Sequence, residues 1–99
     1  MIHVVAIITA QPGQRAALLA AFQENTVAVR AEVGCIEYAA TLDAEGSPAR
    51  FGEDAFVVIE KWSSLADLRA HSVAPHMKAY AAKTKELVKD RVIHLLTPA

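Results

Sequence analysis

The sequence predicts an α+β protein whose elements follow the order β-α-β-β-α-α-β. Residues 2–9 are apolar and mostly β-branched, which is typical of a strand buried on both faces. Residues 14–33 instead repeat apolar side chains at three- or four-residue steps, the period of a helix. Two further strand-like runs flank a polar segment in the middle of the chain. These patterns together predict one small sheet covered by helices.

The first helix follows a turn at Pro12-Gly13 and ends at Gly34, a residue suited to a left-handed cap. Glu32 belongs to its polar faces. Its apolar face comprises Leu18, Phe22, Thr26, Val29 and Val33. The strand that follows runs from Cys35 to Leu42, and the side chains that share one side of it are Ile36, Tyr38, Ala40 and Leu42.

The second half of the chain begins with a loop, residues 43–53, that is rich in turn-forming residues. A strand follows at residues 54–62. Ser63 or Ser64 can cap a short helix that runs from Leu65 to about His71. Pro75 suits the first turn of another helix, and residues 91–96 form the last strand. The buried face expected for that last helix comprises Met77, Tyr80, Ala81, Thr84, Leu87 and Val88.

Two βαβ-type halves joined by a central hairpin make a split-βαβ, ferredoxin-like sheet with its helices on one face. The opposite sheet face is also apolar, since the first, third and last strands lack a clean polar side, and the hydrophobic content of 54% exceeds what a 99-residue core needs. A second copy of the same sheet would cover this face. We therefore expect one domain, residues 1–99, that forms a homodimer through the sheet face, a dimeric α+β barrel. Whether residues 43–53 cross to the partner subunit stays open.

Composition argues against several other classes of protein. The formal net charge of −1, and lysines without interleaved aromatic residues, give no reason to expect a nucleic acid or an anionic membrane as partner. Cys35 is the only cysteine, so no disulfide forms within the chain. The N-terminal apolar run is too short to span a bilayer and lacks the pattern of a signal peptide. We expect a cytoplasmic protein.

Ionisable and aromatic side chains concentrate between residues 60 and 76. Glu60 shares strand parity with Trp62, so its carboxylate projects from an apolar face and needs a partner. That partner is either a histidine, which the carboxylate would orient, or Arg69 or Arg91 in a strand-end salt bridge. His71 suits a general base, although a histidine near a helix end can also simply contact free carbonyls.

His76 is a second candidate base, because a neutral imidazole is expected in the first turn of a helix; otherwise it is a surface residue. A metal site with His71 and Glu60 is not expected. A five-residue spacing turns two imidazoles apart on a continuous helix, and no third nitrogen or sulfur ligand is nearby. Cys35, which follows a helix C-terminus, is interpreted as a small buried hydrophobe rather than a nucleophile.

Four motifs follow one another along the whole chain: Pro12-Gly13, residues 30–38 with their Gly34-Cys35 pair and Tyr38, Glu60-Lys61-Trp62-Ser63, and the histidines at 71 and 76. In this order and spacing the chain resembles the antibiotic biosynthesis monooxygenase family of small dimeric α+β barrels. The resemblance implies cofactor-independent oxygenation of electron-rich aromatics. The superfamily also includes haem-degrading enzymes, but the first strand lacks the asparagine that those carry.

Three functions remain open from the sequence. The first is a monooxygenase, without cofactor or metal, that acts on a small quinol or polyphenol. The second is an isomerase of a small hydroxyketone that uses the same base without oxygen, and the third is a binding or stress-response dimer without catalysis. In the first, His71 is the base or anion stabiliser, His76 assists it and Glu60 orients it. The residues expected to line the substrate pocket are Trp62, Phe22, Tyr80 and Tyr38, although large aromatics such as Trp62 and Tyr38 are more often core residues.

Overall fold

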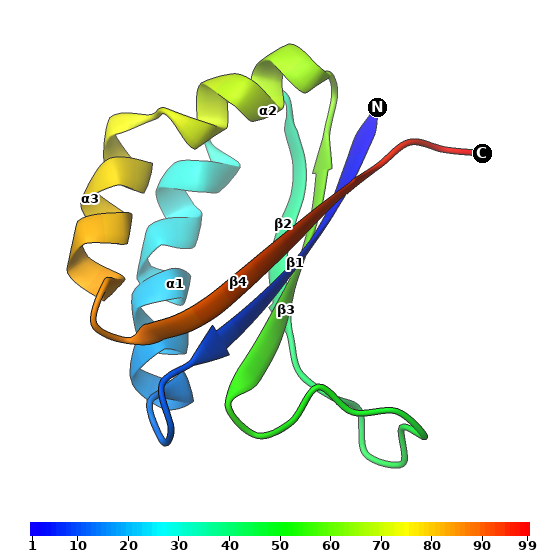
Figure 1. The fold of residues 1–99 in the computed structure, drawn as a ribbon. Helices are drawn as coiled ribbons and strands as arrows, with labels where there is room; N and C mark the ends of the chain where they lie inside the picture. Colours follow the sequence, from blue (N-terminus) through cyan, green and yellow to red (C-terminus); the bar gives the residue numbers. More distant parts are fainter.

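Four strands form one antiparallel sheet in the spatial order β2-β3-β1-β4 in the computed structural model, which describes residues 1–99. Three helices cover one face of this sheet and leave the other face free (Figure 1). This is the predicted ferredoxin-like α+β arrangement with the predicted order of elements. No helix is both long and apolar enough to cross a membrane. The elements are β1 (Ile2–Ala10), α1 (Arg15–Arg30), β2 (Cys35–Thr41), β3 (Ala55–Trp62), α2 (Leu65–Ser72), α3 (Pro75–Thr84) and β4 (Val88–Leu96).

The core lies between the helices and the sheet. On β1, Val4, Ala6 and Ile8 are buried and face the helices, while the residues between them are only half-buried in a single chain. The prediction that residues 2–9 would be buried on both faces is therefore not met in the single chain. The largest fully buried side chains come from both layers: Trp62, Phe56, Leu18, Val4 and Val29.

Helix α1 buries Leu18, Phe22, Thr26 and Val29, as its apolar period predicts. The prediction fails for Val33, which is 84% exposed because α1 already ends at Arg30. Gly34 does adopt the left-handed conformation, with φ +80°, but in the turn that leads into β2 rather than at the end of the helix. This turn carries Glu32.

Strand β2 departs from the predicted alternation. Tyr38 is buried, whereas Ile36 is 54% exposed. The pairing of β2 with β3 shifts register between Cys35 and Glu37, which turns Cys35 toward the core and Ile36 away from it. Leu42 is exposed as well, because it lies beyond the last residue of the strand. The loop that follows projects away from the sheet (Figure 1).

Helices α2 and α3 begin where the sequence predicts. The hydroxyl of Ser64 accepts a hydrogen bond from the backbone N–H of Asp67 (3.1 Å), and Pro75 occupies the first turn of α3. Among the residues predicted for the buried face of α3, Thr84 is buried, and Met77 and Tyr80 pack against the core. The prediction was wrong for Ala81, which is exposed within α3. Leu87 and Val88 also pack against the core, but they follow the helix, because α3 ends at Thr84.

Candidate functional site

Two histidines converge on one carboxylate at the top of the helical layer. Nδ1 of His71 lies 2.8 Å from Oε2 of Glu32, and Nε2 of His76 lies 2.8 Å from the same oxygen. His71 belongs to the last turn of α2 and His76 to the first turn of α3. The helices are interrupted at residues 73–74, so the five-residue spacing no longer separates the imidazoles. A carboxylate only accepts hydrogen bonds, so each of these nitrogens carries a proton toward it.

Glu32 is the residue that sequence reasoning missed, because it was assigned to a solvated helix face. Its position is fixed by two contacts of the α1–β2 turn. The guanidinium of Arg30 donates to the backbone oxygen of Tyr38 (2.9 and 3.1 Å), and the N–H of Ser63 donates to the backbone oxygen of Gly34 (2.9 Å). One signal was available: an acidic side chain at a helix C-terminus is unfavourable unless another group compensates its charge.

His71 is almost completely buried, with 6% of its surface exposed. Its ring centroid lies 4.6 Å from that of Trp62 and 5.6 Å from that of Tyr38. No buried side-chain nitrogen or oxygen of the protein lacks a hydrogen-bond partner, and Nδ1 is the only nitrogen of His71 that has one. Nε2 therefore retains contact with open space. His71 lines a cavity between the helices and the sheet.

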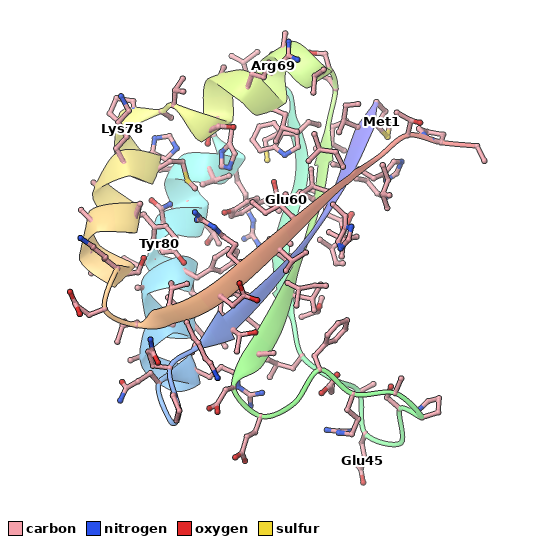
Figure 2. All side chains as sticks on the ribbon, in the orientation of Figure 1. Met1, Glu45, Glu60, Arg69, Lys78 and Tyr80 are labelled. Carbon is pink, nitrogen blue, oxygen red and sulfur yellow. The ribbon has the colours of Figure 1, made fainter.

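Glu60 does project from the helix-facing side of β3 together with Trp62, as strand parity predicts (Figure 2). Its predicted partners were wrong, however. Neither a histidine nor Arg69 nor Arg91 bonds to it; the indole Nε1–H of Trp62 donates to its Oε1 (2.9 Å). The histidine is already bonded to a different carboxylate, and the indole is the nearer donor on the same strand.

Burial raises the pKa of Glu60, and the charge of Glu32 adds to this effect. The hydrogen bond from Trp62 and the charge of His71 act in the opposite direction on the same pKa. Burial likewise raises the pKa of Tyr38 and that of Tyr80, so both phenols stay protonated at neutral pH. Burial also raises the pKa of the Cys35 thiol, in keeping with its interpretation as a small hydrophobe.

The cavity comprises two pockets that share lining residues. The larger, of about 520 Å³, opens under α2 and is lined by His71, Glu60 and residues from β1, α2, α3 and β4. The smaller, of about 90 Å³, continues deeper toward Phe22, Tyr38 and Tyr80. Figure 2 shows Glu60 and Tyr80 between the helices and the sheet. The residues common to both parts are Glu60, His71, Met77, Arg91 and Ile93.

Trp62 does not take its predicted position in the pocket wall. Its side chain is completely buried and lines neither part of the cavity. It lies behind the wall, where it packs against His71 and hydrogen-bonds Glu60. Arg91 is a wall residue that sequence reasoning considered only as an ion-pair partner. It borders both parts of the cavity from β4, and it has no salt bridge.

The chain matches the family model for antibiotic biosynthesis monooxygenase over residues 1–83. It is also 38% identical to the "Probable quinol monooxygenase YgiN" of Escherichia coli K12, over 99% of this chain and 98% of that protein. The chain belongs to the antibiotic biosynthesis monooxygenase family. The resemblance carried by its four sequence motifs is thereby confirmed.

Solved structures share this fold. The protein PA3566 of Pseudomonas aeruginosa superposes with a TM-score of 0.84 at 28% identity, over 99% of this chain and 93% of that one. Rv0793 of Mycobacterium tuberculosis gives a TM-score of 0.82 at 28% identity, over 99% and 94% of the two chains. In this family member, a histidine with one bonded and one open nitrogen faces a largely apolar cavity, an arrangement suited to proton abstraction.

Proposed function

We propose that this protein is a cofactor-independent monooxygenase that oxidises a small electron-rich aromatic, a quinol or polyphenol, with dioxygen. The observation that carries this proposal is the two-sided environment of His71. Glu32 bonds to Nδ1 at 2.8 Å, His71 lines the cavity, and we place its unbonded Nε2 toward that cavity. Membership of a monooxygenase family and the name of the Escherichia coli relative favour this reaction class over others that a base could serve.

A positioned base is sufficient for such a reaction. Dioxygen in its triplet ground state reacts with donors that release one electron at a time, and a deprotonated quinol is such a donor. Nε2 of His71 takes the phenolic proton, and the carboxylate of Glu32 stabilises the imidazolium that forms. The substrate supplies the electrons: one oxygen atom enters the aromatic ring, and the other leaves as water with the protons that the ring and the hydroxyls lose.

The remaining polar residues hold the substrate and the base. Arg91 offers its guanidinium to the phenolate, and Glu60 offers its second carboxyl oxygen to a hydroxyl. His76 positions Glu32, and Trp62 supports the ring of His71 from behind. Apolar residues exclude water from the intermediate, and among them are Phe22, Tyr38, Tyr80, Leu68 and Ile93.

We further propose a homodimer through the helix-free face of the sheet. Val5, Ile7 and Ile59 on this face are half-buried in one chain, and on β4 Val92 and Leu96 are 42% and 48% exposed. Contiguous apolar residues of this kind are covered in a stable protein. Light scattering should give twice the mass of one chain, and Val92→Asp should give the mass of one chain. A wild-type protein that runs as a monomer at micromolar concentration would rule out the dimer.

Oxygen uptake by the metal-free protein with a panel of reduced quinols tests the enzyme proposal. Wild type is compared with His71→Ala and with His71→Gln, which can still donate to Glu32, and labelled dioxygen is followed into the product. Uptake above the spontaneous rate, with label in the product and a loss of about 10²–10⁴-fold in both variants, is expected for a general base. Melting temperatures show whether each variant is folded.

Wild-type protein that matches the buffer blank across the panel would contradict the oxygenase. Turnover of a hydroxyketone without oxygen would point to the isomerase instead. Saturable binding of the aromatic compounds with no turnover of either kind would point to a binding module.

A further inference from the structure

We infer that Glu32, His71 and His76 form a binding site for a divalent transition-metal ion of the Zn²⁺ and Co²⁺ class. The ligand atoms are one carboxylate oxygen and two imidazole nitrogens, and all lie within 4.8 Å of one another. The five-residue spacing that argues against a metal in the sequence does not apply to the folded chain, and the third ligand is an oxygen rather than a nitrogen or sulfur. The break between α2 and α3 brings the imidazoles together, and the carboxylate comes from Glu32 rather than Glu60.

The spacing is close to that of a real coordination shell. In a tetrahedral zinc site with bonds of about 2.1 Å, neighbouring ligand atoms lie about 3.4 Å apart. The two nitrogens are each 2.8 Å from the carboxylate oxygen, so that oxygen must withdraw by about half an ångström to admit the ion. The two nitrogens lie within 4.8 Å of each other, so the imidazoles must approach each other toward the separation of about 3.4 Å. Rotations of the carboxylate and of the two imidazole side chains would supply shifts of this size.

The donor set selects the class of ion. Imidazole nitrogen together with one carboxylate suits Zn²⁺, Co²⁺, Ni²⁺ and Cu²⁺, whereas Mg²⁺ and Ca²⁺ prefer oxygen ligands alone. Three protein ligands also leave one coordination position for water or another small ligand, the pattern of an exchangeable rather than a structural site.

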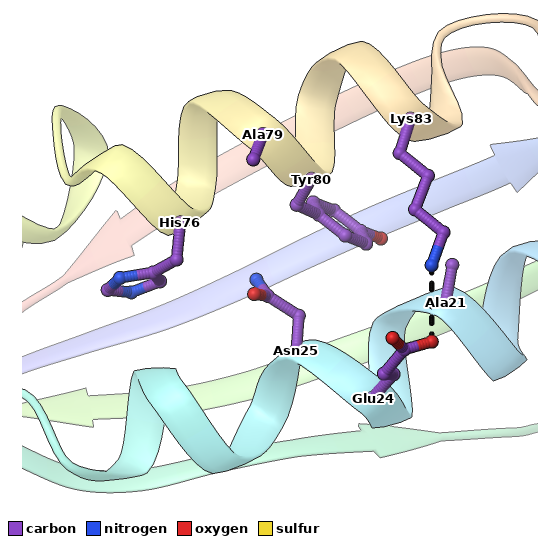
Figure 3. Close-up of a pocket in the computed structure, with 7 residues that line it drawn as sticks. All are labelled: Ala21, Glu24, Asn25, His76, Ala79, Tyr80 and Lys83. Atoms are coloured by element: carbon purple, nitrogen blue, oxygen red, sulfur yellow. Dashed lines mark hydrogen bonds and ion pairs between the residues drawn. The ribbon is translucent and has the colours of Figure 1, made fainter.

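An ion can reach these ligands from outside the cavity. His76 keeps 29% of its side chain exposed, whereas Glu32 and His71 keep 14% and 7%. Figure 3 shows His76 at one end of a groove between α1 and α3, with Asn25 and Tyr80 beside it. His71 borders the cavity on the other side. The site therefore lies between an outer groove and the inner cavity, and the groove is its entry path.

An ion at this site would change what His71 presents to the cavity. With Nδ1 bonded to the metal, the proton of the neutral ring moves to Nε2, the nitrogen that faces the cavity. The open nitrogen then donates a hydrogen bond and no longer accepts a proton. This consequence, which rests on the proposed function, makes the ion an inhibitor of the base.

Binding itself is tested without any turnover. Chelator-treated protein is titrated with Co²⁺, and the visible absorption of the ion reports its coordination. Trp62 is the only tryptophan and lies 4.6 Å from the His71 ring, so quenching of its fluorescence places the ion. One ion per chain is expected in wild type. His76→Ala should weaken binding by more than the roughly 10–100-fold that loss of an outer-shell contact costs.

Glu45→Gln is the matched control, because Glu45 is an exposed glutamate of the loop between β2 and β3, away from the groove (Figure 2). It should bind the ion as wild type does. Long-range ¹⁵N–¹H spectra should show the proton of His71 on Nε2 once Zn²⁺ is bound. Co²⁺ binding that is undetectable, or equally strong in wild type and His76→Ala, overturns the site. None of these measurements depends on oxygen turnover. Their results therefore test the metal site whether or not the protein is a monooxygenase.

Discussion

Oε2 of Glu32 lies 2.8 Å from Nδ1 of His71, although 39 residues separate the two in the chain. The contact joins the turn after α1 to the end of α2, and it is the only hydrogen bond that fixes the orientation of the His71 ring. A carboxylate in this position sets the tautomer of the imidazole and the orientation of its ring.

Glu32→Gln tests this relationship. The amide keeps the shape of the side chain but removes the negative charge that stabilises an imidazolium. We expect kcat for quinol oxidation to fall by about 10–100-fold with KM nearly unchanged, because Glu32 does not border the cavity. Steady-state oxygen uptake measures both constants. Glu24→Gln carries the same chemical change on an exposed part of α1 and should keep wild-type values; an equal loss in both variants would disprove the positioning role.

Most secondary structure could be predicted because it depends on short-range patterns. A few neighbouring residues are enough to predict three features: the apolar face of α1 from Leu18 to Val29, the N-terminal cap of α2 at Ser64, and the start of α3 at Pro75. Errors arose where pairing between strands decided the outcome. The register shift beside Cys35 turns Ile36 outward, and no local sequence pattern predicts a bulge of this kind.

The candidate site could be predicted only in part for the same reason. His71, His76 and Glu60 were identified because ionisable residues stand out in an apolar stretch. Their partners come from distant segments: Glu32 for the histidines, and the indole of Trp62 for Glu60. Parity and helical period describe one element at a time, so they cannot state which carboxylate meets which imidazole.

Glu60→Gln should change the pH dependence of stability. Burial raises the pKa of Glu60 in the folded protein, so the folded state binds more protons than the unfolded chain between the two pKa values. Its contribution to stability is therefore fully present below the unfolded pKa of about 4.3 and is lost as pH rises through the folded pKa. Glutamine remains neutral and avoids this loss. Its amide oxygen still accepts from Trp62.

Urea unfolding at several values from about pH 4 to about pH 8 measures this effect. The free energy of unfolding of Glu60→Gln, relative to wild type, should increase with pH and then level off. Glu37→Gln replaces a glutamate on the neighbouring strand that pairs with Lys61 at the surface (3.4 Å) and controls for the change of residue type. A difference between Glu60→Gln and wild type that is constant across the range would contradict the expectation.

Gly34→Ala should destabilise the protein more than Gly46→Ala. Both glycines have left-handed backbones, with φ +80° and +84°. A Cβ at position 34 would collide with the carboxylate of Asp67 and the hydroxyl of Ser63, whereas position 46 is open. We expect a loss of about 2–4 kcal/mol for Gly34→Ala and about 1 kcal/mol for Gly46→Ala. Chemical denaturation measures both losses of stability. Equal losses would show that the Asp67 side chain moves away from the new Cβ without lowering the free energy of unfolding.

Arg91→Gln should weaken substrate binding without removing the base. Arg91 borders both parts of the cavity and is the cation we assign to the phenolate. A hydrogen bond to a charged group contributes about 1.5–3 kcal/mol, so the dissociation constant should rise about 10–100-fold. Binding of a reduced quinol is measured without oxygen, by the fluorescence of Trp62, which separates affinity from turnover.

Lys89→Gln removes a positive charge from the same strand without touching either part of the cavity and should bind as wild type does. If Arg91→Gln binds the quinol as tightly as Lys89→Gln, the phenolate is held by another group, and Arg69, on the α2 side of the larger part, becomes the residue to replace next.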